Sequence, residues 1–220
     1  MAVAREVEVP AGEFSVTASV HGEGGTAVIL GHGAGGTRRT PFLVQLADAV
    51  AASGRCTVLY NFRYTDQRRR IPDKPEVLER TTAAVGEFAR AELGARHVVH
   101  GGKSMGGRIA SQAVAGGMPA SGLVFLGYPL HPPGKPEHLR DKHFDRVGVP
   151  MLFVQGTRDA FARPELLEGL LRSLGDRARL LRIEGGDHSF VVPRGAGRQA
   201  ADVEAEIARG LVSWLGERGL

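Results

Sequence analysis

The segment Gly102-Lys103-Ser104-Met105-Gly106 is a G-x-S-x-G pentapeptide between a predicted strand and a predicted helix. The residues before it, His97–Gly101, form a short apolar run with a glycine stop. The residues after it, Arg108–Ala115, have a helical pattern that ends at Gly116. A serine at such a turn is presented at the carboxyl edge of a sheet, and small neighbours let the strained turn close. We therefore predict that Ser104 is a nucleophile.

Strand-like and helix-like runs alternate along the rest of the chain. Strands, most of them apolar, are predicted at Thr26–Leu30, Cys56–Phe62, Gly122–Leu126, Met151–Gln155 and Ala178–Ile183. Helices are predicted from Pro41 to about Gly54 and over Pro75–Leu93, Pro164–Leu174 and Arg198–Leu215. This alternation predicts an α/β fold whose mostly parallel sheet is covered by helices on both faces. Two alternating runs at the start, Val3–Val9 and Phe14–Val20, predict an N-terminal antiparallel hairpin.

Length and composition indicate one globular domain over residues 1–220. The chain is 42% hydrophobic, and no Pro-rich or Ser-rich linker divides it. Its N-terminal segment alternates charges without an apolar signal core, and no run approaches the roughly 18 apolar residues that span a bilayer. We expect a cytoplasmic protein with no membrane partner. Cys56, the only cysteine, falls in a predicted strand and is expected to be a buried, inert thiol.

A serine nucleophile needs an imidazole to take its proton and an acid to orient that imidazole. In an open α/β sheet these partners follow later strands, in the order serine, acid, histidine. Asp159 comes after the strand Met151–Gln155, and His188 comes after Ala178–Ile183. Asp187 is a rival acid, but a residue adjacent to the histidine normally directs its side chain elsewhere. We predict a triad of Ser104, Asp159 and His188.

The oxyanion of an acyl-transfer intermediate needs backbone N–H donors. One is expected from Met105, directly after the nucleophile, and the second from the loop after the strand Thr26–Leu30. That loop is rich in glycine, so its backbone is able to approach a substrate carbonyl. We predict that Ala34 supplies the second N–H, with Gly35 as the alternative.

With these motifs, HGAGG at 32–36 and GGKSMGGR at 101–108, the chain resembles the small, lidless α/β-hydrolases of the dienelactone-hydrolase-like group. The resemblance runs from Thr26 to the terminal helix and implies the α/β-hydrolase fold and esterase chemistry. Dienelactone hydrolases themselves have a cysteine nucleophile, whereas this chain has Ser104, so their substrate is not transferred. The same branch resembles a hydrolase-like subunit of a nuclear acetyltransferase complex. A non-catalytic protein-interaction module on the same fold therefore stays open as an alternative.

Three other interpretations of the motifs are weaker. Gly31–Gly36 also matches the G-x-G-x-x-G dinucleotide fingerprint, and Arg63 on a 2′-phosphate keeps an NADP-dependent reductase open. A P-loop is excluded because His97 stands where its first glycine is required. The spacing of the histidines forms no recognised ligand set, so no metal is expected, and the esterase chemistry requires no cofactor. A net charge of +4 with 6% aromatic residues does not indicate a nucleic-acid partner.

The substrate is expected to be a small soluble ester, thioester or lactone. The connection from Tyr128 to Val149, where hydrolases carry a lid, has four prolines and no long apolar helix, so it is expected to form only a rim. Arg63 and Arg68–Arg70 follow a strand that normally borders the active-site crevice. Guanidinium groups bind carboxylates with two hydrogen bonds, so we predict that Arg63 contacts an acidic group of the substrate. The sequence does not set the oligomeric state.

Overall fold

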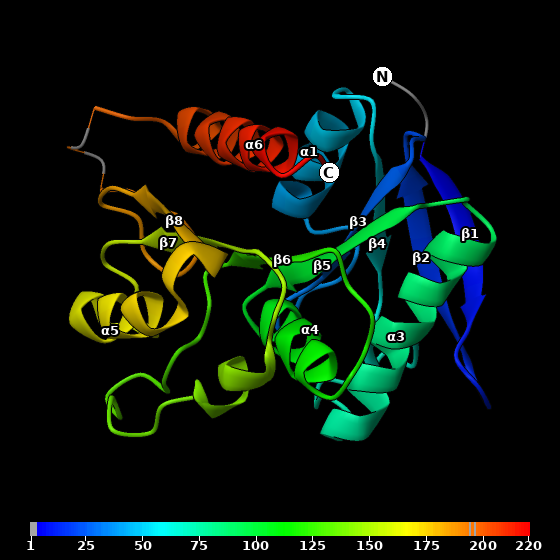
Figure 1. The fold of residues 1–220 in the computed structure, drawn as a ribbon, viewed down its shortest axis with the longest axis horizontal. Helices are drawn as coiled ribbons and strands as arrows, with labels where there is room; N and C mark the ends of the chain where they lie inside the picture. The colour runs from blue at the N-terminus through cyan, green and yellow to red at the C-terminus, as the bar shows by residue number, and fades with distance from the viewer. Residues whose placement is uncertain (1–3, 194, 196) are drawn as a thin grey trace.

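The computed structural model describes residues 4–193, 195 and 197–220, and these form one eight-stranded sheet (Figure 1). Its strands are β1 (Arg5–Pro10), β2 (Ser15–His21), β3 (Thr26–Gly31), β4 (Cys56–Tyr60), β5 (His97–Lys103), β6 (Gly122–Leu126), β7 (Met151–Gly156) and β8 (Ala178–Ile183). Their spatial order is β1-β2-β4-β3-β5-β6-β7-β8. The pairs β1–β2 and β2–β4 are antiparallel and the other pairs are parallel. The predicted fold class, including the N-terminal hairpin, is confirmed.

Helices cover both faces of this sheet (Figure 1). On one face lie α1 (Pro41–Ala51) and α6 (Ala200–Glu217), and on the other α3 (Pro75–Ala91), α4 (Met105–Ala115) and α5 (Pro164–Leu174). Every residue of β3, β4, β6 and β7 is buried, which explains why these strands are continuous apolar runs. On the α1 and α6 side the core includes Trp214 and Leu46, and on the other side it includes Phe125 and Phe153.

The helix boundaries follow local sequence signals. Each of α1, α3 and α5 begins at a proline, which is preorganised for the first helical position. The terminal helix α6 begins at Ala200 rather than Arg198, because Gln199 and Asp202 form a capping box at its start. The predicted start of the first strand, Val3, lies outside the described residues.

Two connections contain short helices. The first was predicted as an arginine-rich loop, and the second was predicted to form a rim with at most a short helix. The helix α2 (Arg63–Asp66) follows β4, and a 3-10 helix, η1 (Lys142–Arg146), lies in the connection between β6 and β7. Phe144 of η1 is buried in the core, so this connection is fastened to the body of the protein.

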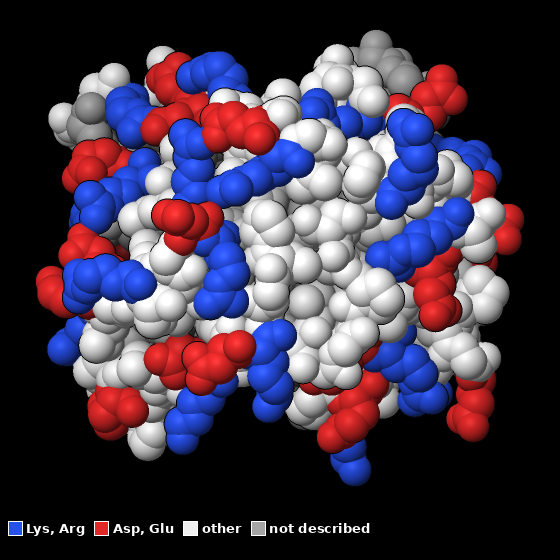
Figure 2. Space-filling model, in the orientation of Figure 1, with Lys and Arg blue, Asp and Glu red and all other residues white. Residues whose placement is uncertain are grey.

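The surface shown in Figure 2 has Lys and Arg interspersed with Asp and Glu around an uncharged central area. Charge of one sign does not gather over this face. In the described part of the chain, no helix combines the length and apolar character needed to cross a bilayer.

Candidate active site

Ser104 is at the turn between β5 and α4, and its backbone is strained. Its φ of 49° and ψ of −109° lie in a region that L-residues rarely adopt. The strand β5 extends to Lys103, two residues beyond the predicted glycine stop, so the serine stands directly at the carboxyl edge of the sheet. The turn is tied to the neighbouring strand by the Ser104 N–H, which donates to the Leu126 carbonyl at 3.1 Å.

Glycines at this turn are required by the close approach of β3. A Cβ atom built on Gly102 would lie 2.1 Å from the Gly31 carbonyl oxygen, and one built on Gly106 would lie 2.3 Å from the same atom. Both distances are far below van der Waals contact. The two glycines of the pentapeptide therefore allow α4 to start against β3, which fixes where Ser104 points.

The structure brings the three predicted triad side chains into one hydrogen-bonded chain. Ser104 Oγ lies 2.9 Å from His188 Nε2, and His188 Nδ1 lies 2.7 Å from Asp159 Oδ2. An ionised carboxylate only accepts, so Nδ1 carries the proton and Nε2 is left with a lone pair toward the serine hydroxyl. This is the arrangement that a general base for Ser104 needs.

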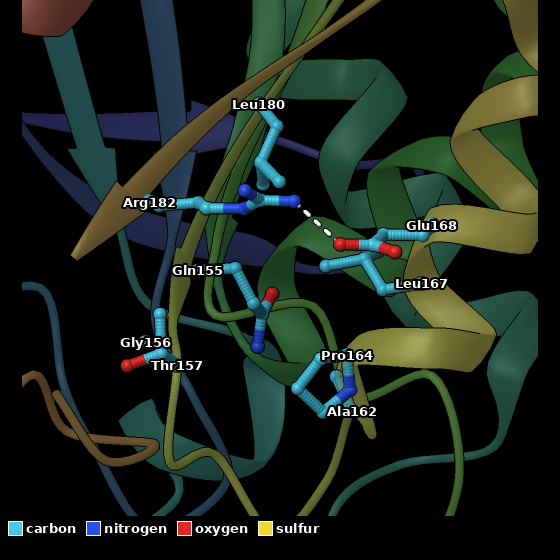
Figure 3. Close-up of a pocket in the computed structure, with 9 residues that line it drawn as sticks. All are labelled: Gln155, Gly156, Thr157, Ala162, Pro164, Leu167, Glu168, Leu180 and Arg182. Carbon is cyan, nitrogen blue, oxygen red and sulfur yellow. Dashed lines mark hydrogen bonds and ion pairs between the residues drawn. The ribbon is translucent and has the colours of Figure 1, made fainter. Parts of the chain in front are cut away.

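The Asp159 carboxylate is fully buried and is held by two further donors. The Gln155 amide, at the end of β7, donates to Oδ2 at 2.5 Å, and the Phe161 N–H donates to Oδ1 at 2.8 Å. Figure 3 shows Gln155 beside a small cavity of about 30 Å³ between β7, β8 and α5, with the Arg182–Glu168 ion pair at its rim. This small cavity is separate from the larger cavity that Ser104 lines, because the two have no lining residue in common. Gln155 was not predicted, because its place beside Asp159 depends on how the chain turns after β7.

The loop after β8 orients His188. Its ring stacks on Phe161, with the ring centroids 4.2 Å apart. Its carbonyl oxygen accepts a hydrogen bond from Lys103 Nζ at 2.5 Å. The rival acid, Asp187, is turned back into its own loop, where Oδ1 accepts from the N–H groups of Ser189 and Val191 at 2.8 and 2.9 Å. Asp159 and not Asp187 is thus the acid on the imidazole.

The predicted oxyanion donors lie on the same cavity as Ser104. Met105 occupies the first position of α4, where N–H groups have no partner within the helix, and Ala34 lies in the loop after β3. His32 fixes that loop: its Nδ1 donates to the Gly33 carbonyl at 2.8 Å, and its Nε2 accepts from the Phe62 N–H at 3.3 Å. Burial lowers the pKa of His32, in keeping with a neutral, structural imidazole.

The cavity at Ser104 has a volume of about 320 Å³, at the small end of the ~300–1,000 Å³ typical of ligand pockets. Its lining includes the apolar side chains of Leu78, Ile109 and Pro129. Its charged lining residues are Asp73, Arg108 and Arg140. Neither arginine was singled out from the sequence, because one is hidden in the helix after the motif and the other in the proline-rich connection.

Arg63 is placed elsewhere. It is the first residue of α2, its guanidinium carbon lies 4.7 Å from the centroid of the Phe14 ring, and it is absent from the lining of the Ser104 cavity. The structure therefore gives no support for contact between Arg63 and a substrate. The dinucleotide interpretation gains no support either, because α1 begins only at Pro41, after the glycine-rich loop has ended.

Comparison with solved structures gives matches over nearly the whole chain. A dienelactone hydrolase from Anabaena variabilis has a TM-score of 0.76 at 19% identity, with 98% of this chain and 97% of that chain covered. XC6422 from Xanthomonas campestris, an α/β serine hydrolase without a lid, has a TM-score of 0.74 at 20% identity, with 96% and 94% covered. Est1E from Butyrivibrio proteoclasticus has a TM-score of 0.73 at 14% identity, with 97% and 98% covered. These likenesses show the fold.

The family is shown by a match to the sequence itself. Residues 24–216 match the family described as the alpha/beta hydrolase domain. The match begins just before β3 and ends within α6, so it includes the whole parallel part of the sheet and all three triad positions. The resemblance inferred from the motifs is confirmed at this level, and the chain belongs to the alpha/beta hydrolase domain family.

Proposed function

We propose that the protein is a serine hydrolase that cleaves a small soluble ester through an acyl-enzyme intermediate. The observation that carries the proposal is the continuous hydrogen-bonded chain from Ser104 Oγ through His188 to Asp159. The open edge of the sheet and the modest cavity support a small substrate, a thioester or lactone included. We further propose that residues 1–220 act as a single domain without a large lid.

In this mechanism Ser104 Oγ attacks the substrate carbonyl carbon as His188 Nε2 takes the hydroxyl proton. Asp159 stabilises the imidazolium and keeps its orientation. The N–H groups of Met105 and Ala34 donate to the oxyanion of the tetrahedral intermediate. The C–O bond to the alcohol then breaks as His188 returns the proton to the leaving oxygen. A water molecule, deprotonated by His188, then attacks the acyl-enzyme carbonyl carbon. The second tetrahedral intermediate breaks its bond to Ser104 Oγ, which takes the proton back from His188, and the acid is released.

The test uses short 4-nitrophenyl esters and a fluorophosphonate probe with the purified protein. Ser104→Ala should lower kcat by roughly 10⁴-fold to 10⁶-fold and abolish covalent labelling, because the nucleophile is lost. Ser173→Ala is the matched control, since this serine is exposed on α5 and only bonds to a carbonyl of its own helix. It should keep full activity and full labelling.

Two outcomes would contradict the proposal. One is near-normal turnover by Ser104→Ala with unchanged circular dichroism. The other is a folded wild-type protein that neither hydrolyses esters, thioesters and lactones nor reacts with fluorophosphonate, and this result would favour the protein-interaction alternative.

A further inference from the structure

The cavity at Ser104 contains two arginine side chains that come from different elements. Arg108 lies on the first turn of α4, and its backbone N–H donates to the Ser104 carbonyl at 3.1 Å. Arg140 lies in the connection between β6 and β7. Both side chains are half-buried and line the same cavity as the nucleophile. Each lowers the pKa of groups near it as a cation does, and Arg140 acts in this way on Arg108.

Neither guanidinium is neutralised by a carboxylate. Arg108 donates to the neutral Gln112 side chain at 3.1 Å, and Arg140 donates to the Pro129 carbonyl at 3.3 Å. Among the described residues, no Asp or Glu oxygen lies within ion-pair distance of either group. Glu79 of α3 acts on Arg108 electrostatically without forming an ion pair with it.

The one acid in the cavity lining is already occupied. Asp73 forms an ion pair with Arg69 and accepts a hydrogen bond from the Tyr64 N–H at 2.8 Å. The guanidinium groups of Arg108 and Arg140 therefore remain as two cations without paired carboxylates in the cavity that Ser104 lines. Half-buried like charges repel each other and lose solvation, so this arrangement costs free energy unless a ligand supplies the negative charge.

The backbone around Arg140 fixes its place at the cavity. The Arg140 N–H donates to the Leu130 carbonyl at 2.8 Å, and the hydroxyl of the buried Tyr128 donates to the Arg140 carbonyl at 2.6 Å. Arg108 is placed by α4, whose start is fixed by the glycine turn. Both cations are thus preorganised on supported backbone, as a specific binding group needs to be.

We propose that Arg108 and Arg140 bind a carboxylate of the substrate, so that the preferred substrate is an ester that also carries a free carboxylate. The guanidinium fork matches the two oxygens of a carboxylate. The apolar lining residues Leu78, Ile109 and Pro129 are suited to contact the short carbon chain between the carboxylate and the ester. This inference rests on the proposed esterase function and names the substrate class for that same site.

Two matched ester pairs test the inference. The first is 4-nitrophenyl hydrogen adipate against 4-nitrophenyl methyl adipate, with the charge on the acyl side. The second is 4-acetoxybenzoate against its methyl ester, with the charge on the alcohol side. The wild-type protein should prefer the anionic member of at least one pair after correction for spontaneous hydrolysis. Arg108→Gln and Arg140→Gln should each lower kcat/KM for that anionic ester by about 10-fold to 100-fold, mostly through KM.

The neutral ester is the internal readout for folding and for the triad. In both variants kcat/KM should fall less for the neutral ester than for the anionic ester, because the neutral ester has no carboxylate to lose, and the ratio of the two kcat/KM values is the measure of the lost preference. Arg172→Gln, which removes an exposed arginine from α5, is the matched charge control and should keep the wild-type preference. Adipate should also raise the melting temperature of Ser104→Ala and fail to do so once Arg108 and Arg140 are both changed to Gln, a readout that needs no turnover.

The outcomes separate this inference from the esterase proposal. If the wild-type protein hydrolyses the neutral and anionic members of both pairs equally, or if the variants lose both members equally, the carboxylate inference is overturned and the esterase proposal stands. If no ester is hydrolysed but adipate binds through the two arginines, the carboxylate site stands and the esterase proposal fails.

Discussion

Single residues around the nucleophile determine how well His188 is held, and Lys103 is the least expected of them. Its side chain is half-buried, its Nζ donates to the His188 carbonyl, and the same Nζ lies 5.3 Å from the centroid of the Phe190 ring. Burial lowers the pKa of Lys103 to about 8, although the carboxylates of Asp159 and Asp187 act in the opposite direction. We therefore expect Lys103 to act as a positioning residue for His188, with a charge that changes near pH 8.

We expect the hydrolysis of neutral esters to fall on the alkaline side with a midpoint near pH 8. Below this pH Lys103 is charged and its hydrogen bond to the His188 loop is charge-assisted. Above it the ammonium loses its proton and the bond weakens. Lys103→Met should lower kcat/KM at pH 7 by roughly 10-fold and should lack the limb near pH 8. The measurement is kcat/KM for 4-nitrophenyl acetate from pH 6 to 9.5, corrected for hydroxide.

The pH profile separates positioning from a merely structural role. A variant that is only less stable would show a lower kcat/KM at every pH and an unchanged alkaline limb. An alkaline limb near pH 8 that persists in Lys103→Met would therefore contradict the assignment, and so would its absence from the wild-type profile.

The sequence predicted the position of a site side chain where the order of the strands determines that position. It did not predict the position where packing against a distant segment determines it. The carboxyl ends of parallel strands meet at one edge, so the order of Ser104, Asp159 and His188 predicted their convergence. Their catalytic roles remain predictions. The sequence did not reveal that the Arg63 side chain packs on Phe14 of the N-terminal hairpin and is absent from the lining of the Ser104 cavity. Contact between Arg63 and a substrate stays a prediction. No pattern in the sequence links these two side chains.

At the scale of elements, the turn from β5 to α4 has to meet two structural requirements, and Gly102 and Gly106 beside Ser104 serve both of them. The turn must hold Ser104 at a positive φ, and the first turn of α4 must pass close to β3. This second requirement predicts a stability effect that does not depend on catalysis. The apolar strands and the helices that start at proline were predicted from the sequence, because the conformational preferences of their residues agree with their burial. The helices α2 and η1 are too short to produce a periodic pattern in the sequence.

We expect Gly106→Ala to lower the free energy of unfolding by about 1–3 kcal/mol or more, because its Cβ would meet the Gly31 carbonyl oxygen at 2.3 Å. The neighbouring atoms are backbone, so no side chain is able to move aside. Gly148→Ala is the control, since this exposed glycine has open space around its Cβ position. It should stay within about 0.5 kcal/mol of the wild type. Urea unfolding followed by circular dichroism measures both, and equal stability of the two variants would show that β3 does not constrain the turn.

At the scale of the whole molecule, the connection between β6 and β7 forms part of the border of the site, because Pro129 and Arg140 line the cavity at Ser104. This segment is held to the body by the buried Phe144, whose ring packs against Phe125 and Phe153 with centroid distances of 5.7 and 5.8 Å. The hydrogen bond from Tyr128 to the Arg140 carbonyl ties it again near the cavity. We therefore expect this segment to form a fixed rim beside Ser104 and not to swing over it as a lid does.

A fixed rim and a cavity of about 320 Å³ predict which acyl chains are cleaved well. Each methylene that is buried in the cavity adds at most ~0.8 kcal/mol of binding, and a methylene outside it adds little. We therefore expect kcat/KM for 4-nitrophenyl esters to peak at short chains and to be lower for decanoate than for butyrate. The rate with tributyrin should also rise smoothly through its solubility limit, because no lid has to open at an interface. A sharp increase in rate at that limit would show that the connection moves. In that case Phe144→Ala, which loosens the connection, should shift the tributyrin concentration at which the increase begins. If the rim is fixed, Phe144→Ala should only lower the stability of the protein.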